Sequence, residues 1–326
     1  MTKKVLVTGG AGFIGSHVVD LFVLSGWQVD VIDNLSSGKT ENLSSGINAF
    51  IQTDILDRAA ASRITGQRYD AICHLAAQID VRKSIQDPVF DARVNVLGTL
   101  SLVEAIRASG HQTRFVFSST GGAIYGDFVV PPSREDSAKE PEAPYGTSKL
   151  SAEYYLAFYA RVLKMDTVAL RYSNVYGPRQ DPHGEAGVVA IFCGRILEGV
   201  PLTVFGDGLQ TRDYVHAADV ARANFLAATR PIPAAGPVDA RSFNIGTGKE
   251  TSVIELARIL RQSGKSDVAL EHAPARPGEL ARSAVNPAKA REVLGWEAER
   301  SLDEGLRETF DWFAGRWRLA AGGGRR

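Results

Sequence analysis

The stretch VLVTGGAGFIG, residues 5–15, decides the fold of this chain. It begins as a short apolar run, typical of a buried strand, and continues into residues 13–24, whose apolar side chains recur at helical spacing. Between them lie Gly9, Gly12 and Gly15. In such a unit the first glycine allows the tight turn, the second lets the backbone approach a pyrophosphate, and the third lets helix and strand pack closely. The stretch therefore predicts a dinucleotide site at the start of the helix, where free N–H groups and the helix dipole attract phosphate.

An acidic residue at the end of the next strand supports the same site. Gln28 to Ile32 forms the second predicted strand, and Asp33 closes it near the spacing of about 20 residues at which an acid binds the ribose. A carboxylate there accepts hydrogen bonds from both ribose hydroxyls and repels a 2′-phosphate, which predicts NAD rather than NADP. Asp54, which follows a third apolar segment at 49–51, either touches the adenine or caps a turn.

Apolar segments and helical patterns alternate through the first half of the chain. Further strands are predicted at 71–75, 114–118 and 167–170, and long helices at 89–108 and 145–163. This alternation indicates βαβ units and a parallel sheet, that is, a Rossmann-like doubly wound α/β fold. We expect residues 1–172 to form this NAD-binding domain, with part of 212–240 returning to it.

The alternation breaks after Arg171, and a smaller α+β region rich in loops follows. Its predicted strands lie at 202–205, 242–245 and 268–271, and its predicted helices at 187–198, 252–262 and 301–314. We expect residues 173–314 to pack on the first domain. We expect residues 315–326, which end in AAGGGRR, to be a disordered tail.

Composition excludes several classes of function. The chain has 326 residues with 37 Lys and Arg against 37 Asp and Glu, so it lacks the basic excess of a protein that binds nucleic acid through phosphate contacts. No apolar run approaches the roughly 18–20 residues of a membrane span, and MTKKVLVTGG leads straight into a strand without a signal peptide. The two cysteines, Cys73 and Cys193, are not at metal-ligand spacing, so we expect no bound metal and a reducing, cytoplasmic compartment.

Tyr145 and Lys149 form the candidate catalytic pair. They are four residues apart in a predicted helix and therefore lie on one face of it. A free tyrosine, with a pKa near about 10, is a poor base at neutral pH, but a nearby ammonium and an oxidised nicotinamide both favour the phenolate. That makes Tyr145 a usable general base. The preceding strand ends in Ser118-Ser119-Thr120, so we expect a hydroxyl from that end to converge with Tyr145 on one substrate oxygen.

Two residues of the fourth predicted strand are assigned to the core. His74 ends an apolar segment, which favours a histidine whose ring nitrogens are satisfied inside the protein over a ligand or a catalytic group. Cys73, directly before it, is expected to pack as a small apolar side chain.

Together the motifs resemble those of one family, the extended short-chain dehydrogenases/reductases, and within it the NAD-dependent epimerases and dehydratases of nucleotide sugars. The matching stretches are TGGAGFIGSH (8–17), SST (118–120), YGTSK (145–149), RYSNVYGPRQ (171–180), VFGDGLQTRDYVH (204–216) and ARPGE (275–279). The resemblance runs from Val5 to about residue 312. It implies 4-epimerisation of a UDP-hexose (UDP-glucose or UDP-galactose) through a transient 4-keto sugar, with NAD retained on the protein.

The resemblance also implies roles for single residues. Tyr145 matches the base, and Lys149 matches the residue that binds the nicotinamide ribose and tunes the base. Thr120 matches the hydroxyl partner, but Ser119 remains a rival because Gly121-Gly122-Ala123 adds a residue before Tyr125. The expected cofactor-binding residues are Gly9, Gly12, Phe13, Ile14, Gly15, Asp33, Asn34, Asp54, Ile55, Leu75, Ala76, Ala77, Asn95, Tyr145 and Lys149.

At the nucleotide-sugar end, Asn174, Arg212 and Arg276 match positions that hold the UDP phosphates. The bidentate fit of an arginine fork to a diphosphate agrees with this, although a surface ion pair between Arg212 and Asp213 is the alternative. The pair Val204-Phe205 resembles the stretch that packs on uracil. Ser283 matches a position at which a small residue admits an N-acetyl group on the sugar.

Several alternatives to this function stay open. Dehydratase relatives place an Asp-Glu pair directly after the threonine of the strand end, where this chain has Gly121-Gly122, so elimination lacks its acid–base pair. UDP-N-acetylglucosamine and UDP-glucuronate are alternative substrates, and a decarboxylase is a further relative. A non-catalytic NAD-sensing protein would be expected to lose Tyr145 or Lys149, and both are present.

We expect the chain to form a homodimer. Relatives dimerise through the two long helices, and here these helices carry apolar residues beyond a single buried stripe. The residues concerned are Val94, Leu97, Leu100, Tyr154, Tyr155 and Phe158.

Overall fold

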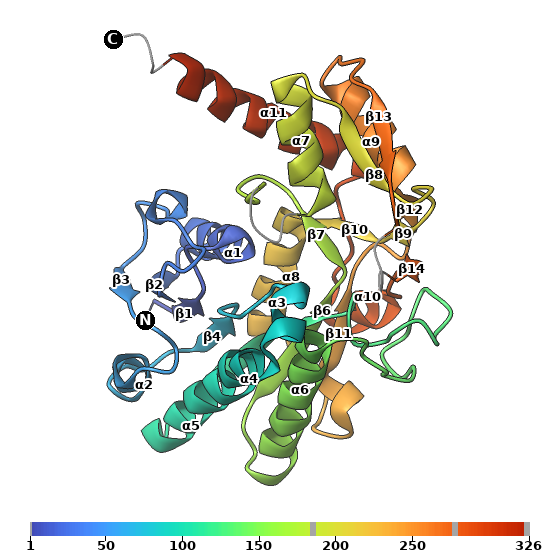
Figure 1. Cartoon of the computed structure of the whole chain (residues 1–326). Coiled ribbons are helices and arrows are strands. Elements are labelled where there is room, and N and C mark those ends of the chain that lie inside the picture. Colours follow the sequence, from blue (N-terminus) through green and yellow to red (C-terminus); the bar gives the residue numbers. More distant parts are fainter. Residues whose placement is uncertain (1, 183–186, 276–279, 323–326) are drawn as a thin grey trace.

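A seven-stranded parallel sheet forms the centre of the larger of two lobes (Figure 1). The structure is a computed structural model that describes residues 2–182, 187–275 and 280–322. From one edge to the other, the strands are β11 (Ser242–Ile245), β6 (Thr167–Tyr172), β5 (Arg114–Thr120), β4 (Ala71–His74), β1 (Lys4–Thr8), β2 (Gln28–Asp33) and β3 (Ala49–Gln52). Every neighbouring pair is parallel. The predicted Rossmann-like doubly wound fold is therefore confirmed.

The strand order reverses beside β1, because the chain runs outward through β2 and β3 and then crosses to β4 on the other side. In a doubly wound sheet, ligands bind at such a switch point, outside the carboxyl ends of the strands. In this chain that edge carries the glycine turn after β1, the loop after β4 and the hydroxyl residues that end β5.

Helices cover both faces of the large sheet, which explains why its strands are nearly continuous apolar runs. Val5 and Val7 of β1 pack in one core cluster and Leu6 packs in another, as the alternation of side chains along a strand requires. The helices on the face of Val5 and Val7 are α1 (Phe13–Leu24), α8 (Ala217–Thr229) and α10 (Ala288–Leu294). Those on the face of Leu6 are α2 (Arg58–Thr65), α5 (Thr99–Ser109) and α6 (Pro144–Val162).

The smaller lobe has a separate core made by three helices and short strands (Figure 1). Its helices are α7 (Val188–Glu198), α9 (Val253–Ser263) and α11 (Leu302–Gly322). Its strands pair as β7 (Asn174–Tyr176) with β10 (Tyr214–His216) and as β8 (Leu202–Phe205) with β13 (Leu270–Ala273). A third small sheet has β9 (Thr211–Arg212) between β12 (Thr251–Ser252) and β14 (Arg282–Ser283).

The structure differs from the sequence prediction in several elements. Residues 242–245, expected in the smaller region, form the edge strand β11 of the large sheet. Helix α11 continues to Gly322, so it extends through part of the segment 315–326 that we expected to be disordered. The predicted helix 89–108 is a continuous run of α4 (Pro88–Ala92), a π-helical segment (Arg93–Gly98) and α5. Elements without a prediction are α2, α3 (Val81–Gln86), α8, α10, β7, β9, β10, β12, β14 and the 3₁₀ turns at Thr40–Asn42 and Val238–Arg241.

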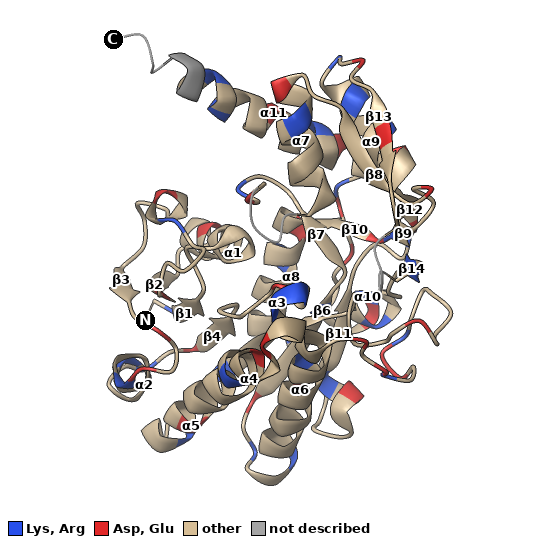
Figure 2. Cartoon of the chain, viewed as in Figure 1, with Lys and Arg blue, Asp and Glu red and all other residues tan. Residues whose placement is uncertain are grey.

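Charged residues of both signs are interspersed over the two lobes rather than gathered by sign (Figure 2). In the part of the chain that the structure describes, no helix combines the length and the apolar character needed to cross a membrane.

Candidate active site

The glycine turn has the geometry that its sequence predicts. Gly9 has a φ of +71°, in the left-handed region that favours glycine, and a Cβ there would lie 2.6 Å from the backbone nitrogen of Ala76. A Cβ at Gly15 would lie 2.0 Å from the carbonyl oxygen of Gly9. Gly12 is the N-cap of α1, so the first-turn N–H groups, which have no partners within the helix, begin directly at Phe13 and Ile14. A turn this close to the backbone of its neighbours, at the positive end of a helix dipole, suits a pyrophosphate.

Asp33 is fixed beside this turn. Its carboxylate accepts hydrogen bonds from Ala11 N at 3.0 Å and from Leu35 N at 2.8 Å, and its two oxygens would both lie 2.9 Å from a Cβ at Gly38. Each carboxylate oxygen has more than one lone pair, so these bonds leave acceptor capacity for ribose hydroxyls. The turn and Asp33 therefore fit a dinucleotide with a free 2′-hydroxyl.

Asp54 makes the turn-capping contacts that were one of its two predicted roles. Its Oδ1 accepts from Leu56 N at 2.9 Å, and its Oδ2 accepts from Asn34 Nδ2 at 2.8 Å. Ile55, next to it, is buried, and a Cβ at Gly98 would lie 2.5 Å from its Cδ1.

The loop after β4 lies directly against the glycine turn. Leu75 N donates to Thr8 O at 3.0 Å, and the backbone of Ala76 lies close to Gly9. Leu75, Ala76 and Ala77 therefore follow one another along the predicted cofactor site. Asn95, expected to contact the cofactor, bonds instead to this loop: its Nδ2 donates to Gln78 O at 2.9 Å and its Oδ1 accepts from Gln78 N at 3.1 Å. The structure gives Asn95 a supporting role in the loop.

His74 is a satisfied core histidine, as predicted. The side chain is 1% exposed, its Nδ1 lies 2.7 Å from Thr8 Oγ1, and its Nε2 lies 3.0 Å from Thr99 Oγ1. The Thr99 hydroxyl donates to Asn95 O at 2.7 Å, so it accepts from His74 Nε2, and Nδ1 is left to accept from Thr8. This pattern requires a neutral ring, and burial lowers the pKa of His74 to about 3.

The catalytic pair lies on the buried side of α6. The Thr120 hydroxyl, at the end of β5, lies close enough to the Tyr145 hydroxyl to lower its pKa. Ser119 Oγ donates to Glu153 Oε1 and is thereby turned away from this contact. Of the two rival hydroxyls, the geometry thus favours Thr120. Lys149 Nζ donates to Ser118 O at 2.9 Å.

The ionisation of the pair is governed first by burial. Burial raises the pKa of Tyr145, the Asp91 charge raises it further, and the Thr120 hydroxyl lowers it. Burial lowers the pKa of Lys149 to about 8, against the opposing charges of Asp91 and Glu153. The Lys149 ammonium is directed to a carbonyl of β5, and the lowering of the Tyr145 pKa by Lys149 stays a prediction.

A buried ion pair behind the catalytic strand end was not predicted. Arg171 of β6 is fully buried and its Nη2 lies 2.6 Å from Glu153 Oε2 and 2.7 Å from Asp239 Oδ1. Two features of the sequence could have indicated this ion pair: Arg171 lies at the end of an apolar strand, and Glu153 lies one helical turn after Lys149. Ser119 donates a hydrogen bond to the Glu153 carboxylate of this ion pair, so the pair holds the end of β5, which carries Thr120, in place.

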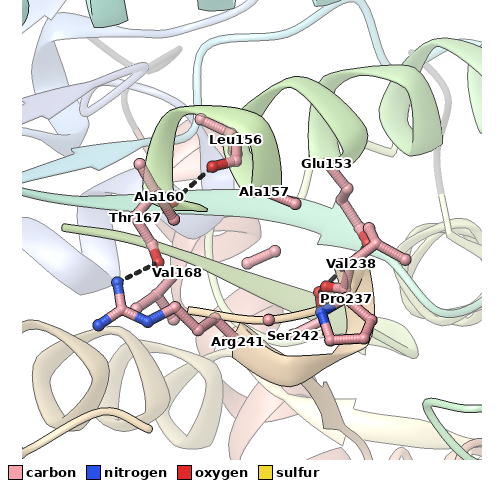
Figure 3. Close-up of a pocket in the computed structure, with 12 residues that line it drawn as sticks. Glu153, Leu156, Ala157, Ala160, Thr167, Val168, Pro237, Val238, Arg241 and Ser242 are labelled. Atoms are coloured by element: carbon pink, nitrogen blue, oxygen red, sulfur yellow. Dashed lines mark hydrogen bonds between the residues drawn. The ribbon is translucent and has the colours of Figure 1, made fainter. Parts of the chain in front are cut away.

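A small cavity lies beside this ion pair, between α6, β6 and residues 236–242 (Figure 3). Glu153, Leu156, Thr167 and Arg241 are among its lining residues. Its volume is about 20 Å³, which is room for a single water molecule and not for a substrate. The cavity therefore belongs to the support of the site and is not the site itself.

An open cleft of about 270 Å³ lies in the smaller lobe, next to the stretch expected to pack on uracil. It is lined by Phe205, Gly206, Asp207, Gln210, Ala275, Leu280 and Ala281. Phe205 thus faces a ligand-sized space. Val204, predicted with it, is fully buried in the core of the smaller lobe, because successive residues of β8 point to opposite faces. The Val204 side chain therefore does not face this cleft, and the packing of the stretch on uracil stays a prediction.

The polar residues expected at the phosphates flank this cleft and the catalytic hydroxyl. A Cβ at Gly122 would lie 3.6 Å from Asn174 Oδ1 and 3.9 Å from Thr120 Oγ1, so the Asn174 amide and the Thr120 hydroxyl both lie close to Gly122. Arg212 of β9 is paired in register with Ser283 of β14. Arg276 lies outside the described residues.

The alternative role for Arg212, a surface ion pair with Asp213, does not fit the position of Asp213. Its carboxylate is fully buried and accepts from Thr247 N at 2.8 Å and from Gly248 N at 3.0 Å. These bonds tie the end of β9 to the loop after β11. Arg212 Nη1 donates to Thr211 O at 2.8 Å.

Residues 6–309 match the family model described as GDP-mannose 4,6 dehydratase. Among curated proteins, the chain is similar to the UDP-glucose 4-epimerase of Mycolicibacterium smegmatis, with 43% identity over 315 residues that cover 95% of this chain and 98% of the relative.

Solved structures show the same relationship. The chain resembles the crystal structure of a UDP-glucose 4-epimerase from Thermotoga maritima with UDP-glucose, with a TM-score of 0.91 and 46% identity over 96% of this chain and 99% of the other. It also resembles the Thermus thermophilus UDP-glucose 4-epimerase in complex with NAD, with a TM-score of 0.87 and 42% identity over 96% and 99% of the two chains.

Proposed function

Because this chain belongs to the GDP-mannose 4,6-dehydratase family of NAD-dependent nucleotide-sugar epimerases and dehydratases, we propose that it is a UDP-glucose 4-epimerase. The observation that carries the proposal is the placement of Tyr145 and Lys149 on α6 next to the end of β5, where Thr120 lies at the carboxyl end of the large sheet. This pair lies beside the turn that fits a dinucleotide, as a reaction between a sugar hydroxyl and NAD requires.

The residues that would hold NAD line one edge of the sheet. The first turn of α1, from Gly12 onward, would hold the pyrophosphate, and Asp33 would accept from the adenosine ribose. Lys149 would donate to the nicotinamide ribose. When bound, NAD supplies the acceptor for the hydride of sugar C4 and later its donor, so that no net redox change occurs.

The chain's own groups move the proton. Tyr145, as the phenolate, takes the proton of the 4-hydroxyl, and Thr120 donates a hydrogen bond to the same oxygen. The 4-keto sugar then presents its other face while its diphosphate stays anchored in the smaller lobe. Tyr145 returns the proton to the oxygen at the end of the cycle, which leaves the enzyme unchanged.

The residues after Thr120 support epimerisation over dehydration. A Cβ at Gly121 would lie 2.6 Å from Val285 Cγ1 and 3.1 Å from the carbonyl oxygen of Arg171. A side chain larger than hydrogen therefore does not fit there without a shift of the backbone. The first residue of the Asp-Glu pair that dehydratase relatives carry directly after this threonine would therefore be crowded at position 121.

The smaller lobe supports a uridine diphosphate as the anchored group. Phe205 lines the cleft and would offer an apolar ring to a base, Arg212 follows the cleft residue Gln210 by two positions, and Asn174 lies near Thr120 at Gly122. Relatives with 42–46% identity to this chain are named UDP-glucose 4-epimerases, which favours UDP-glucose over the N-acetylated and uronate alternatives.

We also infer a homodimer in a reducing compartment. Leu97 and Tyr154 are each 55% exposed on neighbouring helices, which is unusual for large apolar side chains unless a partner covers them. The cysteines, Cys73 and Cys193, are both buried and free, as expected for a cytoplasmic protein.

The test is to incubate the purified protein with UDP-glucose without added NAD and to follow UDP-galactose by chromatography. We expect equilibration of the two sugars, and release of NAD when the protein is denatured. UDP-N-acetylglucosamine and UDP-glucuronate, assayed in parallel, test the alternative substrates. A preparation that releases NADP, or that needs a stoichiometric reductant, would contradict the proposal.

A further inference from the structure

A buried carboxylate next to the catalytic pair has no role in the reaction as described. Asp91 of α4 is fully buried. Its Oδ1 accepts from Gln78 Nε2 at 2.9 Å and from Asn95 Nδ2 at 3.0 Å. Its Oδ2 is buried and receives no hydrogen bond from any residue within the described ranges. Because neutral donors reach one oxygen only, such a carboxylate is costly to bury unless a positive charge compensates it.

The buried ammonium of Lys149 lies on the helix that packs against α4, and it is the positive charge on which the Asp91 carboxylate acts. Helix α4 and the π-helical segment after it pack against α6, which carries Lys149 (Figure 1). The Asp91 carboxylate acts on this ammonium and on the Tyr145 hydroxyl, and it raises the pKa of both groups. Lys149 is itself 3% exposed, so little water screens the interaction.

Asp91 also supports the loop that borders the cofactor site. Gln78, which it binds, accepts from Asp80 N at 2.6 Å through Oε1 and donates to Asp80 O at 2.9 Å through Nε2. Asn95, the second donor to Asp91, holds the backbone of Gln78. The carboxylate therefore joins the cofactor loop to the catalytic helix.

We propose that Asp91 is a positioning residue of the epimerase reaction: its buried carboxylate, with one oxygen left without a hydrogen bond on a helix packed against α6, is the counter-charge of the buried Lys149 ammonium beside Tyr145. The proposal rests on the function proposed above, since it concerns the base of that reaction. Asp91 touches neither reacting atom and acts through Lys149 and Tyr145.

Loss of this charge has a sign that can be measured. Glu153 of α6 also stabilises the ammonium, while the neutral His74 of β4 and the hydroxyl of Tyr172 of β6 face the pair without a charge. Without Asp91, the pKa of Lys149 falls below its value of about 8, and the pKa of Tyr145 falls too. The acid limb of activity, where the base forms, and the alkaline limb, where the ammonium is lost, therefore both move to lower pH.

The experiment compares holoenzymes of wild type and Asp91→Asn, which retains an acceptor for Gln78 and Asn95. The turnover of UDP-glucose is measured between pH 5.5 and 9.5, and we expect both limbs to move to lower pH by about half a unit or more. The matched control is Asp87→Asn, at the N-cap of the same helix, where Oδ1 accepts from Phe90 N at 2.9 Å in an exposed position. Its limbs should stay where the wild type has them.

A second readout does not depend on turnover. The ultraviolet difference spectrum of wild type minus Tyr145→Phe, with NAD and UDP bound, reports the phenolate of Tyr145. When both proteins also carry Asp91→Asn, the phenolate signal of Tyr145 should appear at lower pH than it does without this substitution. If the wild type lacked epimerase activity, the proposed function would fail, whereas this spectrum would still decide the role of Asp91.

Three results would overturn the inference. One is a slower Asp91→Asn enzyme whose limbs and spectrum do not move, which would leave Asp91 a support of the loop only. Another is a shift to higher pH. The third is failure of both Asp91→Asn and the smaller Asp91→Ser to fold with NAD, which would make the carboxylate structural.

Discussion

At the scale of single residues, the chain opposes the ionisation that its reaction needs. Burial and Asp91 both favour the neutral Tyr145, and Lys149 is directed to the carbonyl of Ser118. The phenolate must then be favoured by positive charge that arrives with the oxidised cofactor. The base consequently forms in the holoenzyme, which ties proton removal to the presence of the hydride acceptor.

This argument makes Tyr145→Phe a decisive substitution. Without the hydroxyl, turnover of UDP-glucose should fall by about 10²–10⁴, the usual contribution of a positioned acid–base group. UDP-sugar binding, measured by calorimetry on the holoenzyme, should change little, because the diphosphate is anchored in the smaller lobe. Tyr154→Phe, on the exposed side of the same helix, is the matched control. Near-normal turnover in Tyr145→Phe would remove this residue from the mechanism.

Residues with a local signature could be predicted from the sequence, and residues defined by distant partners could not. Gly9, Asp33 and Tyr145 stand at fixed spacings within motifs, so their roles follow from short stretches of chain. Asp91 has its electrostatic partner in another helix, and Arg171 pairs with Glu153 across the sheet. Only the folded chain shows such contacts.

At the scale of elements, periodicity predicted most helices well but could not assign strands to sheets. Helix α1 begins and ends where its apolar spacing does, at Phe13 and Leu24. The strand at 242–245 (SFNI) was expected from the sequence, yet four residues do not indicate which sheet they join. The structure pairs it with β6, because the chain returns to the large lobe through α8.

The exposed apolar side chains of α6 and the π-helical segment lead to a prediction about assembly. A charge at the centre of a dimer interface is costly to bury, so Leu97→Glu should turn the dimer into a monomer. Sedimentation velocity at micromolar concentration measures this, with NAD content as a check on folding. The control is Leu24→Glu, at the end of α1, where the leucine is 84% exposed. A wild type that sediments as a monomer, or a Leu97→Glu protein that stays dimeric, would contradict the interface.

At the scale of the whole molecule, the site depends on how the two lobes meet. Arg179 of the loop after β7 pairs with Asp20 of α1, and the His17 ring bonds to the carbonyl oxygen of Pro178 at 2.9 Å. Arg316 of α11 pairs with Glu41 at 2.6 Å. These contacts set the smaller lobe against the cofactor side of the sheet, and no sequence motif contains both of their partners.

Two buried histidines make the stability of this arrangement sensitive to acid. Burial lowers the pKa of His74 to about 3 and that of His216 to about 4, whereas both titrate near about 6.5 in the unfolded chain. As the pH falls from about 6.5 toward 4, the unfolded chain takes up protons that the folded chain refuses, so the free energy of unfolding decreases. Above about 6.5 neither state binds these protons and the effect vanishes.

We therefore predict that the free energy of unfolding in urea falls between pH 7.5 and pH 5 by about 2 kcal/mol for each of these histidines, as an upper bound. His74→Gln can still bond to Thr8 and Thr99 but does not titrate, so it should lose about half of this pH dependence, whatever its stability at pH 7.5. His111→Gln, at an exposed position, should retain all of it. An undiminished pH dependence in His74→Gln would show that His74 is protonated in the folded protein, and the hydrogen-bond pattern derived for its neutral ring would then be wrong.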